Sequence, residues 1–169
     1  MRLLFELDTK DYDPNGTAFV RPSVRGILIR DGKIAMVHSL KYDYYKYPGG
    51  GIEPGESLEE ALIREVAEES GLQVIPQSIR EYGLVHRVQK SDREDFFVQD
   101  NYYFLCDAED AVQLQHLDDY EAEERFTLEW VEPQHAIRTN RFEDHGPKDP
   151  IMLEREARVL EILINEGYL

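Results

Sequence analysis

Apolar and polar residues follow a strand-like pattern over much of this chain. Apolar and β-branched residues fill 24–29 and 33–39, and the Asp31-Gly32 pair between them is a typical hairpin turn. The same kind of pattern predicts three further strands, over residues 79–88, 96–106 and 126–131. The hairpin implies that at least part of the sheet is antiparallel.

A helical pattern appears in the middle of the chain, over residues 57–70. Ser57 is a suitable N-cap, and Glu60 three positions later completes a capping box. Gly71 follows the last periodic residue, where a helix C-cap is expected. The segment is therefore predicted to be a helix with defined ends.

The second half of the chain predicts two more helices, a short one over 133–137 and a longer one over 152–165. The acidic stretch 107–124 is predicted to be an exposed loop. Strands interspersed with a few helices favour an α/β sandwich with a mixed sheet and helices packed outside. No repeat or linker divides the 169 residues, so a single domain over 1–169 is expected.

Charge and cysteine content narrow the class of partners. The chain has 35 Asp and Glu against 19 Lys and Arg, a net charge of −16. Nucleic acids and anionic membranes recruit basic surfaces, so neither is expected as a partner. The single Cys106 excludes an internal disulfide. The acidic opening segment and the lack of a long apolar run are not typical of a signal peptide or a membrane span, so a cytoplasmic location is expected.

Carboxylates gather on one side of the first predicted helix. At about 100° per residue, Glu65, Glu68 and Glu69 fall within one arc of roughly 100°, and this arc overlaps the apolar side of the helix. Carboxylates crowded beside a core repel one another, and a divalent cation removes that penalty. Oxygen ligands favour Mg²⁺ or Mn²⁺ over zinc.

The residues from 50 to 72, GGIEPGESLEEALIREVAEESGL, fit the complete pattern GX5EX7REUXEEXGU, in which U is aliphatic. This pattern is the Nudix box, and the chain resembles a Nudix hydrolase. The resemblance implies a Nudix-type α/β/α sandwich with a mixed β-sheet and a loop–helix–loop catalytic motif. It also implies an enzyme that uses Mg²⁺ or Mn²⁺ to cleave a phosphoanhydride bond in a nucleoside diphosphate linked to a group X.

The resemblance assigns roles to the residues of the box. Glu65, Glu68 and Glu69 match the acidic cluster that binds metal in Nudix hydrolases. Arg64 matches the arginine that orients one of these carboxylates. Glu56 is the remaining carboxylate of the box and is expected to support the cluster from behind. Which glutamate accepts the proton of the attacking water stays open.

The resemblance also implies metal ligands outside the box. Gly49 matches a position whose backbone carbonyl ligates metal in some Nudix hydrolases. Many members add a distal glutamate shortly before a strand that carries tryptophan. Glu121, Glu123 and Glu124 are the candidates here, and Glu124, six residues before Trp130, is preferred.

The substrate stays open at the level of the sequence. Val88 and Gln89 occupy positions where a proline is associated with ADP-ribose hydrolases and a tyrosine marks dinucleoside polyphosphate hydrolases. The upstream signature of coenzyme A hydrolases is absent as well. Candidates for contacts with the substrate are basic and aromatic residues, namely Arg25, Tyr45, Tyr47 and Arg87.

Two classes of function fit these observations. The leading one is a hydrolase of a small nucleoside diphosphate derivative, such as a nucleotide or a nucleotide sugar. The alternative is a catalytically silent module that binds such a compound as a ligand sensor. Turnover separates the first from binding without turnover in the second. The exposed side of the C-terminal helix leaves a homodimer open.

Overall fold

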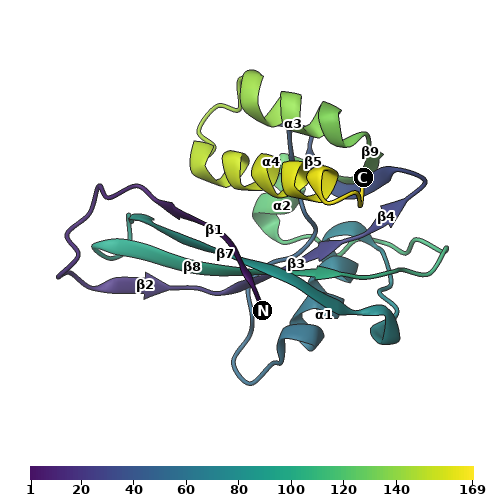
Figure 1. Cartoon of the computed structure of the whole chain (residues 1–169), viewed down its shortest axis with the longest axis horizontal. Coiled ribbons are helices and arrows are strands. Elements are labelled where there is room, and N and C mark those ends of the chain that lie inside the picture. The colour runs from purple at the N-terminus through teal and green to yellow at the C-terminus, as the bar shows by residue number, and fades with distance from the viewer.

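Two β-sheets form the centre of the molecule, and helices cover them from both sides (Figure 1). The computed structural model describes residues 1–169. The elements in chain order are β1 (Leu3–Asp8), β2 (Ala18–Val20), β3 (Ser23–Ile27), β4 (Ile29–Arg30), β5 (Lys33–Ser39), β6 (Tyr44–Lys46), α1 (Leu58–Ser70), a 3₁₀ turn (Pro76–Ser78), β7 (Arg80–Lys90), β8 (Phe96–Leu105), α2 (Asp119–Glu124), β9 (Phe126–Val131), α3 (Pro133–Phe142) and α4 (Pro150–Asn165).

The first sheet has five strands and is mixed. Its centre is the long antiparallel pair of β7 and β8. On one side β1 runs parallel to β7, and on the other side β2 and β3 run parallel to β8 one after the other. The pairing of β2 and β3 with a single strand places the residues between them on the same edge of the sheet.

The second sheet is antiparallel and is built around β5, which pairs with β4, β6 and β9. The predicted hairpin is confirmed, because Ile29 pairs with Ile34 across a turn in which Asp31 and Gly32 both have positive φ, 52° and 72°. The strand predicted over 24–29 is interrupted at Leu28. Its first part, β3, belongs to the mixed sheet, and its last part, β4, belongs to the antiparallel sheet.

Helix α1 covers one side of the sheets and has the ends that the sequence predicts. Ser57 and Glu60 form the capping box, and Gly71 ends the helix in the left-handed conformation with φ 76°. The apolar side of α1 packs on both sheets in a buried cluster that includes Leu62, Val66 and Phe104. This packing fixes the orientation of the helix, and with it the direction of its carboxylates.

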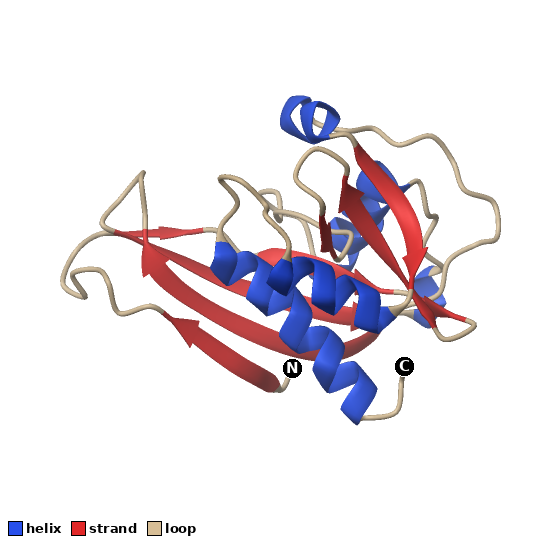
Figure 2. Cartoon of the chain, turned by 90° about the horizontal axis from the view of Figure 1, so that it is seen from above, coloured by secondary structure: helices blue, strands red, loops and turns tan.

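Helices α3 and α4 lie side by side over the opposite side (Figure 2). A second buried cluster fills the space between these helices and the sheets, and it includes Tyr47, Tyr103, Leu160 and Leu163. The α/β/α arrangement with a mixed sheet is therefore confirmed. None of the helices combines the length and the apolar character that crossing a bilayer requires.

Three local predictions need correction. The acidic stretch 107–124 is not an exposed loop throughout, because its end folds as α2 and buries Glu121 and Glu124. The helix predicted over 133–137 continues to Phe142. Strands β1, β2 and β6 were not predicted: β1 and β2 pair with strands distant in sequence, and β2 and β6 have only three residues each.

Candidate active site

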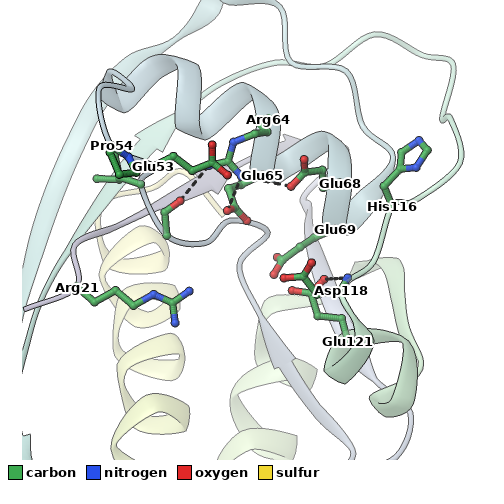
Figure 3. A pocket seen from close by; sticks show the side chains of 12 residues that line it. Arg21, Glu53, Pro54, Arg64, Glu65, Glu68, Glu69, His116, Asp118 and Glu121 are labelled. Atoms are coloured by element: carbon green, nitrogen blue, oxygen red, sulfur yellow. Dashed lines mark hydrogen bonds and ion pairs between the residues drawn. The ribbon is translucent and has the colours of Figure 1, made fainter. Parts of the chain in front are cut away.

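A cavity of about 400 Å³ opens between α1, the loop that precedes it, and the segment leading into α2. Six of its lining residues are acidic, two are arginines and one is histidine. Box residues project into it from α1, while Asp118 and Glu121 face them from the other wall (Figure 3). The full lining is Arg21, Gly51, Ile52, Glu53, Pro54, Arg64, Glu65, Glu68, Glu69, His116, Asp118 and Glu121.

Arg64 connects the carboxylates of the box. Its Nε and Nη2 donate to the two oxygens of Glu56, each at 2.8 Å. Its Nη1 donates to Oε1 of Glu65 at 2.7 Å and to Oε2 of Glu68 at 3.3 Å. Nη2 also donates to the carbonyl of Gly51 at 3.0 Å. One guanidinium thus links the start of the box to the helix, and its hydrogen bonds hold the pKa of Glu56 below its usual range.

Glu69 is the most deeply buried carboxylate of the cavity, with 1% of its surface exposed. Its Oε2 accepts the backbone N–H of Gly49 at 2.9 Å, and its Oε1 is paired with the ammonium of Lys46. Burial raises the pKa of Glu69 to about 7, although the positive charges of Lys46 and Arg25 act in the opposite direction. The position of Glu69 against the Gly49 backbone explains how the loop and the helix form one site.

Glu65 lies beside the glycine loop and is largely buried as well. Burial raises its pKa, and the neighbouring Arg64 opposes the rise. A side chain at position 50 would collide with the carboxylate of Glu65, so Gly50 is required for this close approach. The hydrogen bonds of Glu65 use Oε1 alone, which leaves Oε2 available to a ligand.

The second wall of the cavity is attached to α1 by the segment 113–116. Three hydrogen bonds make this attachment: the N–H of Gln113 to the carbonyl of Gly71 at 2.9 Å, the N–H of His116 to the carbonyl of Glu68 at 2.8 Å, and the side-chain amide of Gln115 to the carbonyl of Glu69. Glu121 then accepts the N–H of Asp118 at 2.9 Å and the hydroxyl of Tyr120 at 2.8 Å. The carboxylate of Glu121 is thereby held in the wall facing Glu69 (Figure 3).

Glu124, the distal glutamate preferred from the sequence, does not line this cavity. Its Oε2 accepts the hydroxyls of Tyr44 at 2.8 Å and Ser39 at 3.1 Å, and its Oε1 is paired with Lys148. These partners satisfy both oxygens in the interior. Of the three candidates, Glu121 is the one that reaches the box carboxylates.

Carboxylate oxygens are the donors that Mg²⁺ and Mn²⁺ prefer, so the chemistry of the lining fits a hard divalent cation. Burial raises the pKa of both Glu65 and Glu69, because the loss of solvation disfavours their charged form more than the neighbouring cations favour it. As the side chains stand, no three His, Cys, Asp or Glu residues converge as a ready ligand set. A cation bound here would require some of these side chains to rotate.

The sequence model of the NUDIX domain matches residues 20–154. The chain belongs to the Nudix hydrolase family. The RNA pyrophosphohydrolase of Stenotrophomonas maltophilia strain K279a is 27% identical over 144 residues, covering 76% of this chain and 68% of that protein. The RNA pyrophosphohydrolase of Xanthomonas campestris pv. campestris strain B100 is 28% identical with the same coverage.

Solved structures of the family share the fold. The MutT Nudix hydrolase from Burkholderia pseudomallei superposes with a TM-score of 0.59 at 17% identity, covering 85% of this chain and 97% of that one. The mutator MutT protein from Bacillus halodurans gives a TM-score of 0.56 at 19% identity, with coverages of 70% and 72%. Together with the family match, this makes the chain a Nudix hydrolase that acts on pyrophosphate bonds.

Two arginines expected to contact the substrate are buried beside the site instead of lining the cavity of this Nudix hydrolase. Arg25 donates to the carbonyl of Gly49, the atom that the family resemblance gives as a metal ligand. Arg87 is paired with Asp149, and burial lowers its pKa to about 10. Both side chains are engaged by groups of the chain itself.

Two tyrosines expected at the mouth are core residues. Tyr45 donates its hydroxyl to Glu129 at 3.0 Å and packs on the ring of His38. Tyr47 is fully buried, and its ring meets Tyr103 edge-on with 5.3 Å between centroids. Neither tyrosine lines the cavity.

Sequence reasoning gave no role to Arg21, and it named Glu121 as a candidate but preferred Glu124. Arg21 lies at the mouth because its N–H bonds to Val98 at 3.0 Å and continues the pairing of β2, a contact that no local pattern predicts. A signal for Glu121 was present in the sequence, because Asp118 and Glu121 have the spacing of a capping box and form one. That signature predicts a helix within the acidic stretch.

Proposed function

We propose that this Nudix hydrolase cleaves a phosphoanhydride bond in a nucleoside diphosphate linked to X, and that it uses Mg²⁺ or Mn²⁺ to do so. The observation that carries the proposal is the excess of carboxylates over cationic side chains around one cavity. Glu65, Glu68 and Glu69 are the proposed metal-binding residues. Glu121 replaces Glu124 as the proposed distal carboxylate.

The bound cation would neutralise the carboxylates and the phosphates together, and it would lower the pKa of a coordinated water. Arg64 keeps Glu56, Glu65 and Glu68 oriented, which makes it a positioning residue. A carboxylate with a pKa near neutrality is suited to accept a proton from water at neutral pH. Burial gives Glu69 this property, and it shifts Glu65 in the same direction.

Arg21 is the proposed contact for the phosphate chain. It is the cationic residue of the cavity that has no carboxylate partner, since Arg64 is occupied by the box. A guanidinium at the mouth can bind phosphate oxygens in pairs. Its charge also helps an acidic protein to accept an anionic substrate.

The aromatic pair Phe19 and Phe97 is the proposed platform for the base. The two rings are half-buried, their centroids lie 5.7 Å apart, and both line a small cavity of about 240 Å³ with Gln89. Phe19 precedes Arg21 by two residues in extended chain, so both lie on the same side about 7 Å apart. This separation is on the scale of a nucleoside between its base and its phosphates.

A second candidate substrate is the triphosphorylated 5′ end of an RNA. It is favoured by the names of the relatives that match over 76% of this chain, which are RNA pyrophosphohydrolases. The net charge of −16 weighs against a long nucleic acid as partner. A short oligonucleotide with a 5′-triphosphate tests this candidate directly.

The experiment is a substrate panel assayed with Mg²⁺, with Mn²⁺ and with EDTA. The panel contains nucleoside triphosphates, nucleotide sugars, ADP-ribose, dinucleoside polyphosphates and a 5′-triphosphorylated RNA oligonucleotide. We expect one class of small nucleotide to be cleaved with kcat/KM above about 10⁴ M⁻¹s⁻¹, and the activity to vanish in EDTA. Glu69→Gln is the inactive variant, and Glu59→Gln, an exposed residue of the same helix, is its control.

Three results would contradict the proposal in different ways. Full activity in EDTA would exclude the metal role. Preferential cleavage of the RNA end would replace the small nucleotide by the second candidate. Tight binding without turnover across the panel would support the ligand-sensing alternative.

A further inference from the structure

Both oxygens of Glu69 are occupied by groups of the chain itself. Oε2 accepts the N–H of Gly49 at 2.9 Å, and Oε1 is paired with the Nζ of Lys46. Glu69 is 1% exposed and Lys46 is 7% exposed. The carboxylate therefore already has a cation beside it before any ion from solution is bound.

The position of Lys46 is fixed by strand β6. Its backbone pairs with Val37 of β5, and its Nζ lies 5.0 Å from the centre of the Phe126 ring. All three residues of β6 are buried. The ammonium is thus held in the interior by its own strand, unlike the exposed Lys33 at the other end of β5.

A lysine at this position destabilises the folded state unless its charge is compensated. Burying an ammonium is unfavourable unless an anion compensates it, and an apolar residue would suit a fully buried strand. Glu69 is the only carboxylate paired with Lys46. The lysine is therefore explained by the charge of Glu69 and not by packing alone.

The other carboxylates of the box differ in this respect. Glu65 keeps Oε2 free, and Glu68 has 42% of its side chain exposed with only Oε2 bonded. Arg64 contacts each of them through a single nitrogen. A cation that enters the cavity meets open oxygens on Glu65 and Glu68 but a competing ammonium on Glu69.

We propose that Lys46 is a built-in counter-ion for Glu69, which keeps this carboxylate oriented in the metal-free protein and competes with a divalent cation for the same oxygen. The inference rests on the proposed metal dependence of the site. Lys46 is a positioning residue, because it acts through Glu69. By competing for this oxygen, Lys46 lowers the affinity of the site for a divalent cation below the affinity that the carboxylates alone would give.

The test is a Mn²⁺ titration of the full chain, followed by the electron paramagnetic resonance signal of free Mn²⁺. It is run at pH 8.5, so that protonation of the cluster competes little with the ion. Lys46→Met keeps the length of the side chain and removes its charge. Lys46→Arg keeps the charge, and Lys33→Gln removes the same charge from an exposed site.

We expect Lys46→Met to lower the Kd for Mn²⁺ about tenfold or more, because a positive charge beside the ion is removed. Lys46→Arg and Lys33→Gln should stay within about twofold of the wild type. In EDTA, Lys46→Met should melt at a lower temperature than the wild type, and Mn²⁺ should restore it. If Lys46→Met folds only when Mn²⁺ is present, this also supports the inference, because the ion then replaces the missing charge of Lys46.

An unchanged or weaker Mn²⁺ affinity of Lys46→Met would overturn the inference and leave the proposed function standing. Failure of Lys46→Met to fold even with Mn²⁺ would also overturn it, since the lysine would then be needed for packing. If the wild type itself binds no Mn²⁺, both the proposed metal dependence and the inference that rests on it are contradicted.

Discussion

Two clusters of charged residues differ in whether their charges are matched. Under α4, Arg155 pairs with Glu156 and Arg87 pairs with Asp149, so two arginines meet two carboxylates. Around the cavity at α1, six acidic residues face two arginines, and Lys46 adds one cation from behind. The charges of the first cluster neutralise one another, whereas the second cluster lines a cavity and has more negative than positive charges.

The difference separates structural charge from functional charge. Arg155 and Glu156 are almost fully buried and also bond to Asn101, at 2.6 Å from Nη1 of Arg155, and to the N–H of Tyr47, at 2.9 Å from Oε2 of Glu156. These bonds tie α4 to the sheet and leave nothing for a ligand. The carboxylates of the cavity also have partners, Lys46 on Glu69 and Arg64 on Glu65 and Glu68. These cations are fewer than the carboxylates, and the negative charge left over is what a bound cation would neutralise.

The largest effect is expected from Glu69→Gln in the cavity cluster. The change keeps the shape of the side chain and removes the charge, so kcat should fall about a thousandfold. Steady-state rates on the best substrate of the panel measure it. The matched Glu59→Gln on the same helix should keep kcat within about twofold. Equal losses in both variants would mean that the cavity carboxylates have no special role.

In the matched cluster, Glu156→Gln should affect stability and leave the chemistry intact. Arg155 would remain buried without its counter-charge, and breaking such a pair costs about 3–5 kcal/mol. Chemical denaturation measures the free energy of unfolding, and kcat of the folded enzyme at low temperature should stay near that of the wild type. A large drop in kcat with unchanged stability would instead assign Glu156 to the reaction.

The pH dependence of stability should differ between the wild type and Glu69→Gln in EDTA. Burial raises the pKa of Glu69 from 4.5 in its ordinary state to about 7 in the folded protein. The folded state then holds the proton more tightly than the unfolded state, so this group makes the fold less stable as pH rises from about 4.5 to 7. Relative to Glu69→Gln, the wild type should lose up to about 3 kcal/mol over this window. Parallel curves for the two proteins in denaturant titrations at several pH values would contradict this assignment.

A smaller effect is expected at the proposed base platform. Phe97→Ala removes one of two rings whose stacking with a base is worth about 1–3 kcal/mol, so KM should rise about tenfold or more while kcat changes little. Phe142→Ala, at an exposed ring of α3, is the control. A fall in kcat with unchanged KM would move Phe97 from substrate binding to the chemistry.

Local signals predicted the parts of the fold that depend on local structure. The ends of α1 follow from Ser57, Glu60 and Gly71, which form the predicted caps. The strand over 126–131 was predicted with its observed bounds. Strands β2 and β6 were missed, because each is only three residues long, and β2 depends in addition on a partner far along the chain.

The sequence predicted the residues of the candidate site only where their direction follows from their spacing along a helix. Glu65, Glu68 and Glu69 reach the cavity because the spacing of the helix directs them there. The difference between Glu121 and Glu124 depends on Lys148, which pairs with Glu124 from the segment before α4. Arg25 and Arg87 were expected at the mouth because they are basic, but Gly49 and Asp149 engage them in the interior.

The most direct test of the unmatched cluster is a Mn²⁺ binding isotherm for the wild type, Glu65→Gln and Glu59→Gln. We expect the wild type to bind Mn²⁺ saturably, Glu65→Gln to bind it at least about tenfold more weakly, and Glu59→Gln to match the wild type. Equal affinity of Glu65→Gln and the wild type would contradict the claim that the excess carboxylates of this cavity hold a divalent cation.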